Sequence, residues 1–160
     1  MHAASSRILS TVLCCLWATS ASAGKESAIS LDSVPSLIRN TANSAMEGIS
    51  FQSANTEKET NGTLVYELQG KLSDGRNIEV DIFSSGKIEE IEIEFISSQV
   101  PGAVLNAIAA KIPGFKPTYI EASHSVSLKV IKYEFEGLLG EQILDLEVSA
   151  DGRKITIEDK

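Results

Sequence analysis

Apolar and polar residues alternate one by one along several short stretches of the chain, a pattern typical of half-buried β-strands. Ile91, Ile93 and Phe95, for example, alternate with glutamates. The same alternation, often bounded by Asn-Gly, Asp-Gly or Ser-Gly turns, predicts strands over 49–56, 64–70, 78–83, 87–95, 118–123, 128–136, 142–149 and 154–158. Because the turns between these strands are short, we expect neighbouring strands to pair antiparallel.

Two other stretches, near residues 34–46 and 100–112, have apolar residues at helical spacing. Each begins beside a proline, Pro35 or Pro101, and the first turn of a helix does not need the missing N–H. Gly48 and the pair Pro113-Gly114 are typical of helix ends. The sequence therefore predicts two helices, each followed by four strands.

The two helix-and-strand stretches resemble each other. The Val-Pro pair at Val34 recurs at Val100, 66 residues later, and the Tyr-Glu pair at Tyr66 recurs at Tyr133, 67 residues later. Equivalent matches in the same order at nearly one spacing indicate an internal repeat. We therefore expect an α+β fold of two tandem repeats, each an N-terminal helix packed on a four-stranded antiparallel sheet. The predicted segments are a signal peptide at 1–23, a linker at 24–32, and repeats at 33–98 and 99–160.

The predicted signal peptide has three recognisable parts. Arg7 precedes an apolar run that ends at Trp17 and is too short to span a bilayer, and Ala21-Ser22-Ala23 is a small-residue cleavage site. We therefore expect a periplasmic or secreted protein with no membrane insertion after cleavage. Cleavage after Ala23 would remove both cysteines, which excludes disulfides and thiolate metal sites from the mature chain.

The charge balance narrows the class of partner. The chain has 22 acidic and 14 basic residues and a formal net charge of −8, and loss of Arg7 with the signal peptide would make it one unit more negative. An acidic chain is a poor ligand for nucleic acid or for an anionic membrane surface. It favours a cationic partner, although acidity also serves solubility alone.

Period-two alternation places the acidic residues on one face of the predicted sheets and the apolar residues on the other. Because the helices are the only predicted cover for the apolar side, we expect the carboxylates to face water. The predicted partner-binding residues are Glu67, Glu79, Asp81, Glu90, Glu92, Glu94, Glu134, Glu136, Asp145 and Glu147. A solvated face that only prevents aggregation is an alternative. No calcium-loop motif occurs, so no metal site is predicted.

The sequence contains no recognisable catalytic constellation. His124 is the only histidine of the predicted mature chain and lies in a Ser-His-Ser segment, where we expect it to be exposed at a strand end or turn. One histidine and no cysteine cannot supply a zinc site. No nucleophile elbow, phosphate-binding loop or dinucleotide-binding motif occurs. We therefore expect no catalytic residue and no cofactor, and a protein that is not an enzyme.

A family resemblance adds to these expectations. Val100-Pro101, Ala107-Ile108, Pro113-Gly114, Tyr133-Glu134-Phe135 and Asp151-Gly152-Arg153-Lys154-Ile155 resemble the pattern of PepSY domains. The tandem layout is similar to the PepSY-like group related to β-lactamase inhibitor proteins, although Glu47-Gly48 replaces the Pro-Gly stop in the first copy.

The resemblance implies a non-enzymatic exported module that binds or regulates another exported protein, such as a secreted or periplasmic hydrolase. β-Lactamase inhibitor proteins clasp an enzyme with the concave face of two such repeats. One alternative is an envelope cation-binding or sensory protein that uses the acidic face. Another is a structural domain without a tight ligand.

Overall fold

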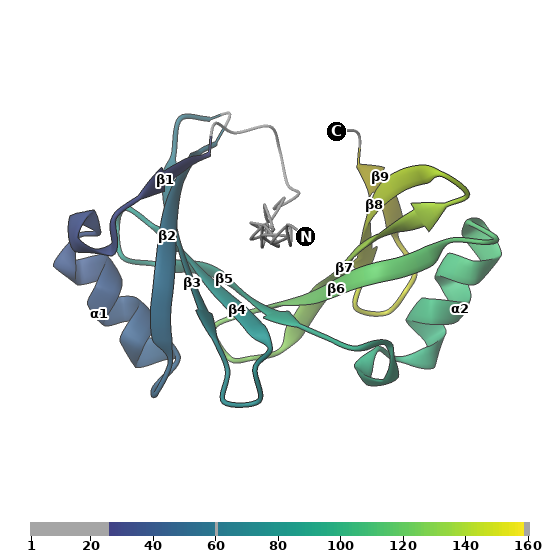
Figure 1. The fold of residues 1–160 in the computed structure, drawn as a ribbon, viewed down its shortest axis with the longest axis horizontal. Coiled ribbons are helices and arrows are strands. Elements are labelled where there is room, and N and C mark those ends of the chain that lie inside the picture. The colour runs from purple at the N-terminus through teal and green to yellow at the C-terminus, as the bar shows by residue number, and fades with distance from the viewer. Residues whose placement is uncertain (1–25, 60, 159–160) are drawn as a thin grey trace, which may run out of the picture.

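A computed structural model describes residues 26–59 and 61–158, so the predicted signal peptide lies outside the described residues. Nine strands form one sheet in which each strand pairs antiparallel with its neighbour in the chain (Figure 1). The strands are β1 (Ser27–Ile29), β2 (Ser50–Lys58), β3 (Leu64–Lys71), β4 (Asn77–Phe83), β5 (Ile88–Glu94), β6 (Lys116–His124), β7 (Val130–Leu139), β8 (Gln142–Ser149) and β9 (Ile155–Glu158). The helices are α1 (Ser36–Ala45) and α2 (Gly102–Lys111), and the short 3-10 helices are η1 (Leu31–Ser33) and η2 (Ser97–Gln99).

The predicted fold class, two tandem repeats of a helix on a four-stranded sheet, is wrong. β5 and β6 pair with each other over four residue pairs, from Ile91 with His124 to Glu94 with Glu121, so one sheet continues through the middle of the chain. Two separate sheets would each end there in a strand with unpaired backbone N–H and C=O groups, and this pairing removes both edges. Local sequence patterns do not encode which strand edges meet, so they do not predict this junction.

The predicted positions of individual elements are largely confirmed. Both helices and all eight predicted strands are present, with ends shifted by a few residues. The turn glycines behave as expected: Gly75 follows Asp74 with a φ of 89°, a conformation that glycine adopts without strain. β1 was not predicted, and it pairs with β2 from within the stretch expected to be a linker. None of the helices in the described ranges is long and apolar enough to span a membrane.

Each helix covers an apolar patch on the same side of the sheet. Ile38 and Ala42 of α1 join a buried cluster with Leu68, Val80 and Ile91. Val104 and Ile108 of α2 pack in a second cluster that includes Phe135, Leu146 and Val148. Burial of these side chains accounts for the apolar half of the strand alternation.

The sheet is bent into an arch (Figure 1). α1 and α2 lie on its outer, convex side, and the central strands β4 to β7 form the floor of the inner, concave side. Register irregularities in the β4–β5 and β6–β7 pairs, next to Asp81 and Ser123, accompany this bending. The face opposite the helices is therefore concave, and its side chains converge toward one another.

Candidate functional site

The concave side of the sheet carries all ten predicted acidic residues, and the strand register shows how they meet. We call this surface the acidic face. Three rows of side chains cross neighbouring strands: Glu67, Asp81 and Glu90; then Gln69, Glu79, Glu92, Ser123 and Lys132; then Glu94, Glu121, Glu134 and Glu147. Glu136 and Asp145 pair beyond the last row.

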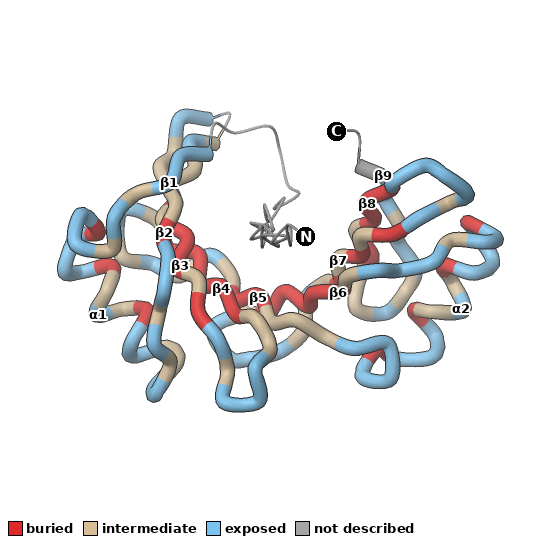
Figure 2. Tube along the Cα trace, in the orientation of Figure 1, coloured by how far each residue is buried: buried red, intermediate tan, exposed pale blue. Residues whose placement is uncertain are grey.

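The expectation that these carboxylates face water is wrong for half of them. Buried residues are Glu67, Glu79, Asp81, Glu92 and Asp145, while Glu90, Glu94, Glu134, Glu136 and Glu147 are half-buried. Residue alternation assigns side chains to a face but does not report how strongly the sheet bends. Inside a concave sheet the side chains of adjacent strands crowd together and shield one another from solvent. Figure 2 shows that buried residues are concentrated along the strands in the middle of the sheet.

One group on the acidic face is neutralised by a lysine. The Nζ of Lys132 lies 3.0 Å from Glu134 Oε1, 3.5 Å from Glu147 Oε2 and 3.6 Å from Glu90 Oε2. We call these four residues the lysine cluster. Burial acts to lower the pKa of Lys132, but the carboxylates of Glu134 and Glu90 outweigh it and hold that pKa above its usual range.

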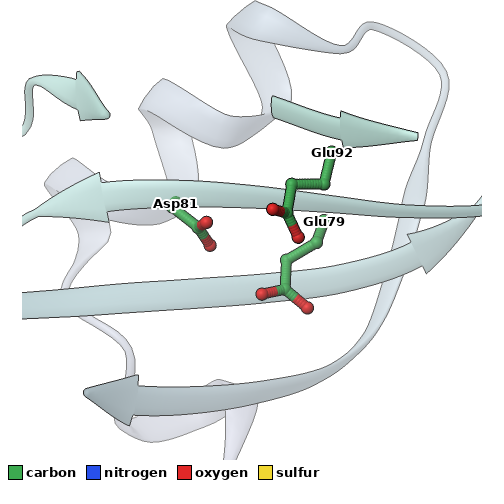
Figure 3. A group of neighbouring side chains, drawn as sticks. All are labelled: Glu79, Asp81 and Glu92. Atoms are coloured by element: carbon green, nitrogen blue, oxygen red, sulfur yellow. The ribbon is translucent and has the colours of Figure 1, made fainter. Parts of the chain in front are cut away.

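A second group, Glu79, Asp81 and Glu92, comes from β4 and β5 and is called here the carboxylate cluster (Figure 3). One carboxylate oxygen of each residue lies within 4.8 Å of the others. Glu79 Oε2 accepts a hydrogen bond of 2.7 Å from Gln69 Nε2, and Glu92 Oε1 accepts one of 3.2 Å from Ser123 Oγ. Neither donor carries a full charge, so neither neutralises the cluster.

Burial changes the acidity of this region. Desolvation, reinforced by the charge of Glu67, raises the pKa of Glu79 to about 8. Desolvation and neighbouring carboxylates likewise raise the pKa values of Asp81 and Glu92 well above their usual range. Desolvation, with the nearby charges of Glu26 and Glu57, raises the pKa of Glu67 to about 7. The carboxylate cluster therefore holds protons at neutral pH unless another positive species replaces them.

Sequence reasoning missed four polar residues of the acidic face: Gln69, Glu121, Ser123 and Lys132. Glu121 is buried and accepts a hydrogen bond of 2.7 Å from the Tyr119 hydroxyl. Lys132 has the same parity as Glu134 in its strand, so continuing the alternation by one step would have placed it on this face. The sequence offered that signal, but it did not indicate that one lysine contacts three carboxylates.

His124 lies at the end of β6, as predicted, but the prediction that it is exposed is wrong, because the residue is buried. Its Nδ1 lies 3.2 Å from the carbonyl oxygen of Ile91, and its ring packs 5.9 Å from the ring of Phe95. Successive residues of a strand point to opposite faces, so His124 lies on the helix side and Ser123 on the acidic face. This arrangement keeps the histidine away from the carboxylates.

No family model matches the chain, and no curated protein matches it. The PepSY-like resemblance therefore stays a prediction. Among solved structures, a protein of unknown function from Bacteroides vulgatus, provisionally assigned to the periplasm, is similar to this chain. It is 21% identical, covers 84% of this chain and 100% of its own, and superposes with a TM-score of 0.37. A likeness at this level carries no conclusion about fold or function.

Proposed function

We propose that the protein is an exported, non-catalytic binding module whose acidic face takes a basic segment of another exported protein. One observation carries the proposal. The sheet presents a concave side with carboxylates from six neighbouring strands, and Lys132 contacts only part of them. A concave surface of one charge favours encounter with an oppositely charged partner.

The half-buried members of the acidic face are the ones that a partner would contact. Glu136 and Glu94 lie next to the buried groups and are partly exposed to solvent. Carboxylate oxygens in such a position accept hydrogen bonds from arginine or lysine side chains. Inhibition of a secreted or periplasmic hydrolase is a narrower form of this proposal, and its support is the PepSY-like resemblance alone.

Two features support a non-catalytic role. The single histidine of the predicted mature chain is buried on the helix side with its Nδ1 against a backbone carbonyl. The nearest hydroxyl in its strand, on Ser123, belongs to the opposite face. A histidine that activates a serine needs both side chains on one side of the scaffold. Export is supported by the signal-peptide pattern of the first 23 residues.

Crosslinking followed by charge reversal tests the proposal. The tagged protein is crosslinked in an envelope extract of its own cells, and the crosslinked residues of both proteins are identified by mass spectrometry. We expect crosslinks around the acidic face and a partner peptide rich in lysine or arginine. Crosslinks confined to the helix side, or a partner site without basic residues, would contradict the proposal.

A matched pair of variants then measures affinity for the partner peptide. Glu136→Lys reverses a charge on the acidic face, and Glu141→Lys makes the same change in the exposed β7–β8 turn. Because charge reversal in an interface weakens binding through repulsion, we expect an affinity loss of about tenfold for Glu136→Lys and little change for Glu141→Lys. If the two variants lower the affinity equally, the acidic face is not the binding surface.

A further inference from the structure

The carboxylate cluster contains buried oxygen atoms without hydrogen-bond partners. Within the part of the chain that the structure describes, Glu79 Oε1 and Asp81 Oδ1 have no partner, and the two residues are 1% and 8% exposed. Glu67, across from Asp81 on β3, contributes a third such atom, Oε2. Buried acceptors left unsatisfied are rare in folded proteins because each costs about 1–3 kcal/mol. Three together indicate that a positive species belongs there.

The geometry limits what that species can be. Figure 3 shows the carboxylates of Glu79, Asp81 and Glu92 close to one another on neighbouring strands. Their nearest oxygens lie within 4.8 Å of one another. Two oxygens that each contact one Ca²⁺ at ~2.4 Å are separated by at most about 4.8 Å, so the spacing of each pair is compatible with a shared ion.

The lysine cluster provides an internal comparison. Glu90, Glu92 and Glu134 also have oxygens within 4.8 Å of one another. The ammonium group of Lys132 already lies 3.0 Å from Glu134 and 3.6 Å from Glu90, so these two carboxylates have their positive charge. Glu92 is the residue that this group shares with the carboxylate cluster. Among the described residues, neither Glu79 nor Asp81 makes an ion pair. The carboxylate cluster is therefore the group that lacks a positive counter-charge.

The type of ligand atom selects the class of cation. The cluster offers carboxylate oxygens only, and His124 lies on the opposite face of the sheet. Zinc and copper favour nitrogen and sulfur ligands, whereas hard cations favour oxygen. Between the hard cations, Mg²⁺ demands near-ideal octahedral geometry at ~2.0–2.1 Å and retains several waters. Ca²⁺ accepts irregular sets of carboxylates at longer distances.

We propose that Glu79, Asp81 and Glu92 form a calcium site at the floor of the acidic face, with Glu67 beside it. The site does not depend on the partner proposed above, because it requires only the buried oxygens of β3, β4 and β5. Bound calcium would satisfy the unpartnered acceptors and neutralise the repulsion among three adjacent carboxylates.

Calorimetric titration with CaCl₂ at pH 8, on chelator-treated protein, tests the site. We expect one calcium per chain and a melting temperature that rises by about 5 °C or more in millimolar CaCl₂. MgCl₂ at the same concentration should produce a smaller rise. No binding heat together with an unchanged melting temperature would overturn the proposal.

Variants locate the site on the acidic face. Glu79→Gln combined with Asp81→Asn preserves side-chain size, and we expect the calcium dissociation constant to rise at least tenfold. Glu136→Gln removes a half-buried carboxylate of the same face outside the cluster and should leave the constant unchanged. If the double variant loses its fold, as judged by circular dichroism, the single Glu92→Gln variant replaces it. Weak binding of several ions, equal in the wild type and the variants, would show nonspecific attraction and contradict the site.

Discussion

The two groups on the floor of the acidic face have similar carboxylates but different electrostatics. In the lysine cluster, the Lys132 ammonium group contacts Glu90, Glu134 and Glu147 within 3.6 Å. In the carboxylate cluster, Glu79 and Asp81 are more deeply buried and each retains an unpartnered oxygen. The first group is complete within the chain, whereas the second needs a proton or a cation from solution.

This difference shows how one sheet face can combine a group with a fixed counter-charge and a group whose charge depends on pH and on bound cations. A built-in lysine supplies a positive charge next to the carboxylates of Glu90, Glu134 and Glu147. Carboxylates without a built-in partner change their state with pH and with the cations present. Because the two clusters differ in this way, substitutions in one cluster should have effects that substitutions in the other do not.

Removal of Lys132 should produce the largest loss of folding stability. The side chain of Lys132 is only 16% exposed, and Lys132→Met would leave three carboxylates without their counter-charge. Breaking a buried ion pair by deleting one partner destabilises a protein by about 3–5 kcal/mol, so we expect a loss of about 3 kcal/mol at pH 8. Urea unfolding measures the change. The same substitution at exposed Lys129 should alter the unfolding free energy by less than about 0.5 kcal/mol, and equal losses at the two sites would contradict the role of Lys132.

The pH dependence of stability should report the carboxylate cluster. The folded protein raises the pKa of Glu79 to about 8 from 4.5, so between these values it binds a proton that the unfolded chain releases. Stability is therefore greatest at low pH within this range and falls as pH rises from about 5 to 8, with Glu79 alone contributing about 1 kcal/mol per pH unit. The charged groups that face this region from the neighbouring strands are Glu67, Asp81, Glu90, Glu92, Glu94, Glu121, Glu134 and Lys132. Burial also raises the pKa values of Glu67, Asp81, Glu92 and Glu121, so these four carboxyl groups act in the same direction.

Calcium-free protein, unfolded in urea at several pH values, tests this dependence. Glu79→Gln with Asp81→Asn should flatten the curve because the amides do not titrate. A stability that is constant or rises between pH 5 and pH 8 would contradict the burial of uncompensated carboxylates.

Addition of a lysine should give the carboxylate cluster a counter-charge like the one in the lysine cluster. Gln69 lies directly across from Glu79 and donates a hydrogen bond to it, so Gln69→Lys would place an ammonium group beside the cluster. We expect a gain of about 1 kcal/mol at pH 8 in calcium-free buffer, together with a weaker response to calcium. Gln52→Lys, at an exposed position of β2, adds the same charge and should do neither. A gain from both variants would indicate only a general effect of net charge.

Most secondary structure could be predicted because it follows from local patterns. Alternation over Ile78 to Ile82 sets a strand, and Pro35 or Pro101 marks the start of a helix. The junction between β5 and β6 could not be predicted in this way, because it joins residues separated by the whole of α2. The error in fold class arose at that junction.

The candidate site also has features that follow from local sequence and features that depend on contacts between distant segments. Its acidic residues and their common face follow from strand parity, and this assignment needed no knowledge of the three-dimensional structure. Their burial follows from the curvature of the sheet, which is accompanied by register irregularities beside Asp81 and Ser123. The contrast between the two clusters depends on Lys132 reaching carboxylates of three strands. Both features arise only when distant segments assemble.

The most direct test is a titration of the Glu79 side-chain carboxyl carbon by NMR in calcium-free protein, assigned by comparison with Glu79→Gln. Burial without a counter-charge predicts a midpoint near pH 8, shifted strongly downward when calcium is added. A midpoint near 4.5, unchanged by calcium, would show that Glu79 is solvated or already paired, and would contradict the account of the acidic face.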